Sequence, residues 1–160
     1  MIALVTALFL SGTATAAEAC YSAKEIEAEQ GVRIHSELMV IGLTCIKMPQ
    51  GQELYRKYHT FTNKNSRLIA GYETDLIAYY NKQGVGSPEQ KLHTLRTNLA
   101  NEISRRAITM STLSFCRKFA SNLDQALAMD QQRLRKWAQR TSTTQPVSEP
   151  VCNKVALNLK

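Results

Sequence analysis

The sequence lacks the short motifs of common catalytic, redox and metal centres. Its four cysteines include no Cys-x-x-Cys pair, so neither a thioredoxin-like centre, a usual zinc site nor a covalent haem attachment is indicated. A Gly-x-Ser-x-Gly elbow, a His-Glu-x-x-His helix and a glycine-rich phosphate loop are also missing. The repeated Glu-x-x-His of di-iron helical bundles does not occur either. We therefore predict no catalytic residues, no cofactor and no metal site.

Glycine and proline are also scarce, with seven and four residues in a chain of 160. Both residue types interrupt helices, and residues 89–145 contain neither. Upstream, Pro49 with Gly51 and Gly84 with Gly86 mark two turns between long stretches of helix-like periodicity. The sequence therefore predicts an all-α fold without a sheet, an up-and-down helical bundle of three to four helices.

Hydrophobic periodicity places the first two helices. The first is expected to begin near Ser22 and to end before Pro49. Its apolar face has members three or four residues apart, widened by their neighbours: Ile34, Leu38, Met39, Val40, Ile41, Leu43, Cys45 and Ile46. The second, which we expect to end at Gln83, carries a stricter seam: Leu54, Tyr58, Phe61, Asn65, Leu68, Tyr72, Leu76 and Tyr79. Both helices are therefore expected to bury one face in the bundle.

A third helix is expected to begin at Ser87-Pro88-Glu89-Gln90, which has the capping-box arrangement with proline at the first helical position. One helix from there to residue 139 would be roughly 75 Å long, against about 35 Å for the first helix. Because serine and threonine compete for backbone hydrogen bonds, we predict a break near residues 111–114 and two helices of matched length. Their apolar residues are Leu92, Leu95, Leu99, Ile103, Met110, Leu113, Leu123, Leu127, Leu134 and Trp137.

No lysine or arginine precedes the apolar run at residues 2–10, which is unusual for a signal peptide. The run is nevertheless only half of the roughly 20 residues that a membrane-spanning helix needs. We therefore interpret residues 1–19 as a secretory signal peptide cleaved after Ala16 or Ala19, with a buried first helix as the alternative. Export would place the protein in the periplasm or outside the cell, not spanning a membrane after cleavage.

Export makes the cysteines candidates for disulfides. In an up-and-down bundle over residues 20–140, Cys45 and Cys116 reach one end, and an extended tail over residues 141–160 can bring Cys152 to Cys20 at the other. We therefore predict a disulfide-stapled bundle with the bridges Cys45–Cys116 and Cys20–Cys152. Free thiols, or bridges between two chains, are the alternative.

Positive charge is in excess, with a formal net charge of +7. A basic exported protein is attracted to anionic surfaces, although a solvated basic surface without a dedicated partner is equally compatible. The candidate basic face on the second helix comprises Arg56, Lys57, Lys64 and Arg67. Nucleic acid is not an expected partner of an exported protein. The tyrosines of the seam, Tyr58, Tyr72 and Tyr79, are therefore interpreted as core residues, and Tyr55 and Tyr80 as possible surface contacts.

These observations favour a non-enzymatic envelope protein that binds a protein or an anionic surface polymer, as an adaptor, chaperone or structural component. The alternative is an enzyme or small-ligand carrier with an inter-helix pocket, in which His35, His59 or Tyr72 would supply polar groups. The third histidine, His93, lies one helical turn after Glu89, and an exposed pair of this kind contributes only a few tenths of a kcal/mol. Histidines that converge in one closed cavity would favour the alternative.

Overall fold

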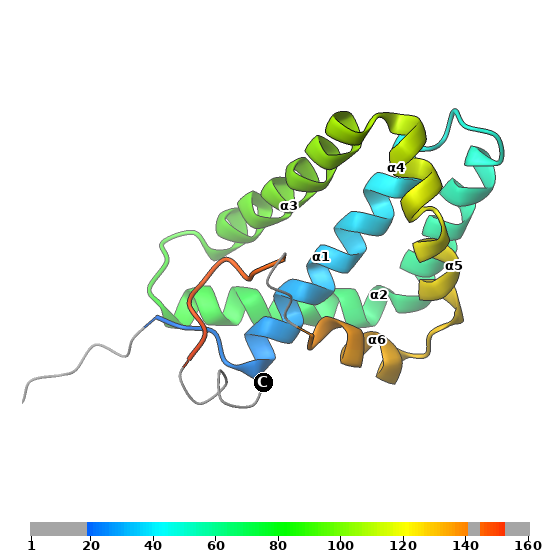
Figure 1. Ribbon diagram of the computed structural model, residues 1–160. Coiled ribbons are helices and arrows are strands. Elements are labelled where there is room, and N and C mark those ends of the chain that lie inside the picture. The colour runs from blue at the N-terminus through cyan, green and yellow to red at the C-terminus, as the bar shows by residue number, and fades with distance from the viewer. Residues whose placement is uncertain (1–18, 141–144, 153–160) are drawn as a thin grey trace, which may run out of the picture.

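The computed structural model describes residues 19–140 and 145–152 (Figure 1). Within these ranges the chain forms six α-helices, and its β-structure is limited to isolated bridges such as that between Tyr21 and Val151. The helices are α1 (Ala23–Thr44), α2 (Gly51–Lys82), α3 (Pro88–Met110), α4 (Thr112–Phe119), α5 (Ser121–Ala128) and α6 (Gln131–Ala138). The prediction of an all-α fold stapled by disulfides is confirmed. The predicted signal peptide falls almost wholly outside the described residues.

Helix α1 is the centre of the molecule, because α2, α3, α4 and α6 all pack against it. Neighbouring segments bury it on nearly all sides, and glycine occupies positions where these neighbours approach closely. A side chain at Gly31 would collide with the Tyr72 ring, so glycine lets α2 pack directly against α1. Buried residues of α1 therefore include polar ones, Glu29, Gln30, Arg33 and Ser36, which a simple apolar stripe does not predict.

The break predicted near residues 111–114 is confirmed at Ser111, which separates α3 from α4 with a left-handed φ of 69°. The segment beyond it is divided further than expected, into the three short helices α4, α5 and α6. Asp130 explains the last division, because its side chain accepts a hydrogen bond from the Arg133 backbone N–H at 2.8 Å and caps α6. The expectation of a single helix after the break was therefore wrong.

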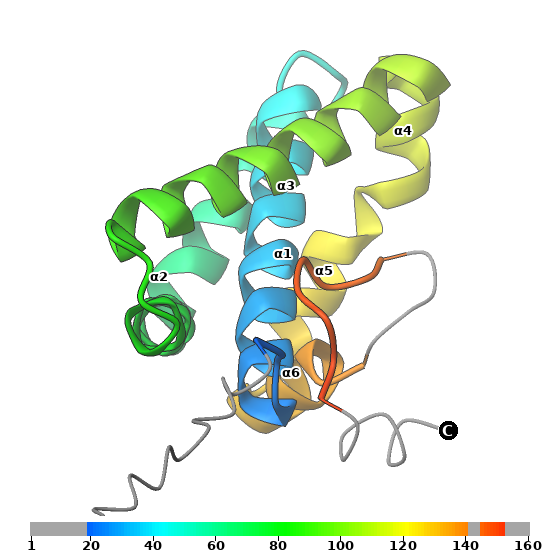
Figure 2. The same ribbon diagram turned by 90° about the vertical axis from the view of Figure 1, so that its left-hand side faces the viewer.

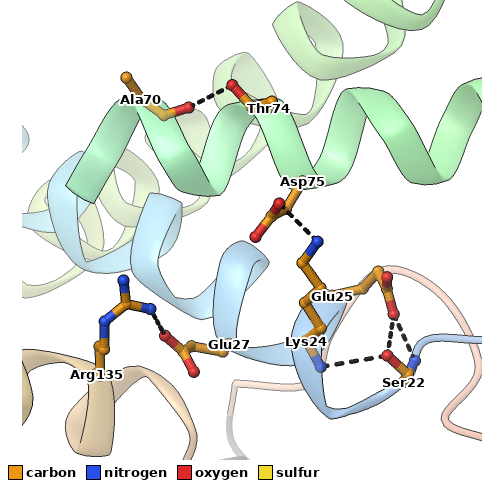
Figure 3. A network of polar contacts seen from close by, with 8 residues as sticks. All are labelled: Ser22, Lys24, Glu25, Glu27, Ala70, Thr74, Asp75 and Arg135. Atoms are coloured by element: carbon orange, nitrogen blue, oxygen red, sulfur yellow. Dashed lines mark hydrogen bonds and ion pairs between the residues drawn. The ribbon is translucent and has the colours of Figure 1, made fainter. Parts of the chain in front are cut away.

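The hydrogen bonds that cap the helix starts also differ from those predicted from the sequence. Helix α3 begins at Pro88 as expected, but the Ser87 side chain makes no capping hydrogen bond. A complete capping box is found instead at the start of α1. There the Ser22 hydroxyl accepts from the Lys24 N–H at 3.3 Å, and the Glu25 carboxylate accepts from the Ser22 N–H at 2.9 Å (Figure 3).

Residues 145–152, which we call the C-terminal strap, run in extended form alongside α1 (Figure 2). The strap is tied to the start of the bundle by the Cys20–Cys152 disulfide and by hydrogen bonds of Tyr21, whose N–H donates to Pro150 O at 2.7 Å and whose carbonyl accepts from the Cys152 N–H at 3.0 Å. The strap thus closes the bundle at the end opposite Cys45.

The strap also pairs with the buried polar residues of α1. Gln30 donates to Gln145 O at 3.0 Å, and Arg33 donates to Pro146 O at 3.1 Å and to Glu102 of α3 at 2.9 Å. Backbone carbonyls of the strap thus accept hydrogen bonds from Gln30 and from a terminal nitrogen of Arg33, although both side chains are shielded from water. The Nε of Arg33 has no hydrogen-bond partner among the described residues. No helix in the described part of the chain is long and apolar enough to cross a membrane.

Candidate functional site

The Cys45–Cys116 disulfide organises one end of the bundle. Cys45 caps the C-terminus of α1 and Cys116 lies in α4, with their Cα atoms 5.7 Å apart. The second predicted bridge, Cys20–Cys152, is also present, with a Cα separation of 5.1 Å. Both predicted pairings are confirmed, and the first holds the middle of α4 against the end of α1.

Large apolar side chains are strongly exposed at this same end. Leu43 is 50% exposed, Ile108 79% and Leu113 42%, and no other large hydrophobic residue of the described ranges is as exposed. They lie together in the fold because Leu43 is in the last turn of α1, Ile108 is in the last turn of α3 and Leu113 begins α4. Exposed apolar side chains that gather in one region mark interaction surfaces more often than isolated ones do.

An open groove of about 420 Å³ is lined by one of these side chains, that of Leu113. Met48, Pro49 and Leu54 lie on the α2 side of it, whereas Leu113 and Arg117 lie on the α4 side. Cys116, which forms a disulfide with Cys45, also lines the groove. The groove therefore has apolar side chains on both sides and the cation Arg117 on the α4 side, and the Cys45–Cys116 disulfide ties α4 to the end of α1.

Cationic side chains surround the apolar ones. Exposed Lys47 follows Cys45, Arg105 precedes Ile108 by three residues on α3, and Arg117 and Lys118 lie on α4. None of the four forms an ion pair within residues 19–140 and 145–152. We call the resulting patch the disulfide-end surface; its members are Leu43, Lys47, Arg105, Ile108, Leu113, Arg117 and Lys118.

The one carboxylate that lines the groove is already neutralised. Asp124 of α5 pairs with Lys57 of α2, with 2.6 Å between carboxylate oxygen and Nζ. A ligand that reaches the groove therefore meets apolar side chains and the unpaired guanidinium of Arg117. The disulfide-end surface is thus chemically suited to a group that is apolar in part and negatively charged in part.

Three of the four cations of the basic face predicted on α2 have partners within the fold. Lys57 and Lys64 are used inside the fold, since Lys57 pairs with Asp124 and Lys64 donates to the carbonyls of Leu127 and Met129 at 2.9 and 3.1 Å, which ties the end of α5 to α2. Arg56 pairs with Glu53 of its own helix at 2.5 Å. Arg67 alone of the four makes no hydrogen bond or ion pair to the described residues.

The three histidines do not meet in one closed cavity. His35 lies between α1 and α2, where its ring stacks on Tyr58 and its Nε2 is 3.4 Å from the hydroxyl oxygens of Tyr58 and Thr62. Burial, with a smaller effect of the nearby Arg96 charge, lowers the pKa of His35 to about 4. His59 is exposed and bonded to the Tyr55 hydroxyl at 2.9 Å.

His93 shares an open groove of about 340 Å³ with His35 and Arg96, but it is exposed and does not pair with Glu89. Tyr72 of α2 does not line this groove and lies instead at a separate cavity. In the part of the chain that the structure describes, no three His, Cys, Asp or Glu residues are placed to hold a metal ion. The residues of the enzyme alternative are therefore not brought together in one cavity.

The predicted burial of three residues was wrong. Tyr80, expected as a surface contact, is buried with its hydroxyl 3.3 Å from that of Tyr21, because the N-terminal segment before α1 crosses the end of α2. Leu43 and Leu113, expected in the core, are exposed. For Leu113 the reason is the break at Ser111, which turns α4 away from the line of α3. Their periodic spacing gave no signal that could separate them from core residues.

Comparison of the chain with protein-family models, with curated protein sequences and with solved structures found no match in any of the three.

Proposed function

We propose that the chain is a non-enzymatic binding module of the cell envelope, which docks an acidic, amphipathic segment of a partner protein on the disulfide-end surface. The observation that carries this proposal is the gathering of Leu43, Ile108 and Leu113 at one end of the bundle, within a set of unpaired cationic side chains. Two disulfides support a location in an oxidising compartment, the periplasm or the extracellular space.

The chemistry of such docking follows from the patch. Burying a leucine or isoleucine side chain at an interface removes apolar surface from water and is worth about 1.5–3 kcal/mol. A few apolar anchors of this kind dominate binding energy in most interfaces, while charges at the rim accelerate encounter and select partners. Leu113 and Ile108 would supply the anchors, and Arg117 and Lys118 the rim.

The groove supports a protein segment over a lipid or polymer surface as the occupant. A cavity of about 420 Å³ next to Leu113 can receive one or two apolar side chains of a partner. A membrane surface or a uniform polyanion would use the charges without filling the groove. The partner is therefore expected to present a hydrophobic side chain flanked by Asp or Glu.

The test is site-specific photocrosslinking in the native envelope. A photoreactive residue at position 113 is expected to capture a discrete protein, whereas the same residue at exposed position 78, near the far end of α2, captures none. Crosslinks from position 113 to lipid alone would overturn the proposal, as would equal yields of the same protein from both positions.

The captured protein is then purified and its affinity measured. Replacing both anchors, in an Ile108→Asp and Leu113→Asp variant, should weaken binding by a factor of about 100, because two interface anchors are lost. The matched control is Ala70→Asp, which adds a negative charge at an exposed position of α2 far from the patch. Similar weakening by the control would show general charge repulsion and contradict docking at this surface.

A further inference from the structure

A smaller cavity, of about 210 Å³, lies between α2 and α6, far from the disulfide-end surface. Arg67, Gly71, Tyr72, Thr74 and Asp75 of α2 line one side of it, and Arg135 of α6 lines the other. Figure 3 shows this region, with Arg135 on α6 below and Thr74 and Asp75 on α2 above. The two arginines come from segments that are 68 residues apart in sequence and meet only in the fold.

The guanidinium groups at this cavity are only partly used. Arg67 makes no hydrogen bond or ion pair to any residue of the described ranges. One terminal nitrogen of Arg135 donates to Glu27 of α1 at 2.7 Å (Figure 3), and the other donates to no residue of the described ranges. The Arg135 guanidinium also lies 5.9 Å from the centre of the Tyr72 ring, which fixes its position.

The carboxylates nearby are already engaged. Asp75 is paired with Lys24 at 2.8 Å, and Glu27 accepts from Arg135 and from Gln139, each at 2.7 Å. Each acidic group therefore has its own cation, and Arg67 supplies positive charge in excess. An anion that entered the cavity would meet this excess charge together with the unused guanidinium nitrogens.

Tyr72 adds an unpartnered donor. Its side chain is only 5% exposed, and its hydroxyl is buried beside the Glu27 carboxylate without a hydrogen bond of ordinary geometry. Burial, together with the Glu27 carboxylate, raises the pKa of the Tyr72 hydroxyl, which therefore keeps its proton throughout the physiological range. A buried hydroxyl with no partner is unfavourable, so a ligand that accepted its hydrogen bond would remove that cost.

Gly71 points to the same cavity. It lies inside α2, where glycine is a poor helix former, yet its φ is not left-handed and a side chain there would meet nothing within 4 Å. Packing of the described residues therefore gives no reason for glycine at this position. A missing side chain does allow another molecule to approach the backbone closely.

We propose that the α2/α6 cavity is a binding site for an oxyanion, either a carboxylate or a phosphate group, held by Arg67 and Arg135 with the Tyr72 hydroxyl as a further donor. Guanidinium groups suit both anions because their N–H donors match pairs of oxygens. The volume is below the 300–1,000 Å³ of drug-sized pockets, so the occupant is a small anion or the anionic end of a longer molecule. The site is independent of docking at the disulfide-end surface.

The test titrates the purified protein with inorganic phosphate and, separately, with glutarate, each at constant ionic strength maintained with chloride. The readout is the chemical shift of the arginine Nε–H groups. Saturable shifts at Arg67 and Arg135 are expected, and the anion that saturates at lower concentration identifies a phosphate or a carboxylate site. Shifts that rise without saturation for both anions would overturn the proposal.

Variants separate the site from general charge attraction. Arg67→Gln should weaken binding about tenfold, because a charge-assisted hydrogen bond is lost. The matched control is Arg56→Gln, another exposed arginine of α2 that lies outside the cavity. Equal weakening by both variants would show attraction to net charge and overturn the proposal. Tyr72→Phe keeps the ring against Gly31 and is expected to weaken binding several-fold; an unchanged affinity would remove the hydroxyl from the site.

Gly71→Leu gives the sharpest contrast, because stability and binding should change in opposite directions. Leucine is a good helix former and meets open space, so the melting temperature should rise by about 3 °C. The same side chain would occupy the cavity and abolish saturable anion binding. A more stable protein that binds the anion unchanged would contradict the assigned site.

Discussion

Glu29 is fully buried although it carries a carboxyl group, and its surroundings explain how the fold accommodates it. The backbone N–H of Ser148 donates to one carboxyl oxygen at 2.8 Å and the Ser148 hydroxyl donates to the other at 2.5 Å. Burial raises the pKa of the Glu29 carboxyl, whereas these hydrogen bonds and the nearby Arg33 charge oppose the increase. The strap is therefore needed to satisfy α1, and α1 in turn fixes the strap.

His35 should make stability depend on pH below neutrality. Its pKa is about 4 in the folded protein, against 6.5 for an unperturbed histidine, because burial between α1 and α2 disfavours the charged form. Between these values the unfolded chain binds a proton that the folded protein does not, so stability falls as the pH drops from 6.5 to 4. The loss amounts to about 3 kcal/mol at pH 4, as an order of magnitude.

Urea unfolding of the wild type and of a His35→Leu variant between pH 4 and 8 tests this expectation. The variant should show a smaller decrease of stability toward acid, while His93→Gln, at an exposed position, should follow the wild type. Glu29 and Glu37, whose pKa values are raised by burial, act in the opposite direction in all three proteins. Parallel curves for wild type and His35→Leu would contradict a buried neutral His35.

At the scale of helices, the two serine caps offer a direct comparison. Ser22→Ala removes the hydroxyl of the capping box that starts α1 and should destabilise the protein by about 1 kcal/mol. Ser87→Ala should change the free energy of unfolding by much less, because the Ser87 side chain makes no capping hydrogen bond at the start of α3. Chemical denaturation of both variants measures the difference, and an equal loss would show that Ser87 also caps its helix.

Helices with one buried face could be predicted from the sequence, and α2 shows why. Phe61, Asn65, Leu68, Tyr72, Leu76 and Tyr79 of its predicted seam are all buried. The seam predicts burial because α2 contacts the bundle along a single stripe. Helix α1 has no such stripe, since neighbours surround it, and its buried Glu29 and Arg33 depend on a strap that is more than 110 residues away in sequence.

The candidate sites could be predicted only in part. Arg67 was identified among four basic residues, but the fold uses Lys57 and Lys64 to hold α5, which spacing along one helix cannot reveal. Arg135 reaches the same cavity only because α6 packs against α1, which also packs against α2. Isoleucine is a residue type that usually lies in the core, so the sequence does not show that Ile108 is exposed. Its exposure follows from its place in the last turn of α3.

The molecule as a whole is a central helix closed covalently at both ends. The Cys45–Cys116 bridge fixes the end that carries the disulfide-end surface, and the Cys20–Cys152 bridge holds the strap at the opposite end. Long loops between the bonded cysteines, with sequence separations of 71 and 132, make each bridge worth about 4–5 kcal/mol in the chain-entropy model. The groove and the cavity are therefore expected to be preformed, which lowers the entropic cost of binding.

The two bridges should differ in their susceptibility to reduction. Cys45 and Cys116 are buried, whereas Cys20 and Cys152 are both partly exposed. Reduction requires the thiolate of the reductant to reach a sulfur atom of the disulfide. A low concentration of a thiol reductant should therefore open Cys20–Cys152 of the folded protein first. The strap would then detach, while α1 to α4 stay connected through Cys45–Cys116. Alkylation followed by mass spectrometry detects the order, with circular dichroism as the control for retained helix.

A Cys20→Ser and Cys152→Ser variant separates the strap from the disulfide-end surface. It should unfold at lower denaturant concentration, because Glu29 and Arg33 lose partners that only the tethered strap holds in place. Crosslinking from position 113 should be retained, because the groove is organised by the other bridge. Early alkylation of Cys45 or Cys116 in the wild type would instead mean that the bundle opens at its docking end, and the preformed groove would have to be abandoned.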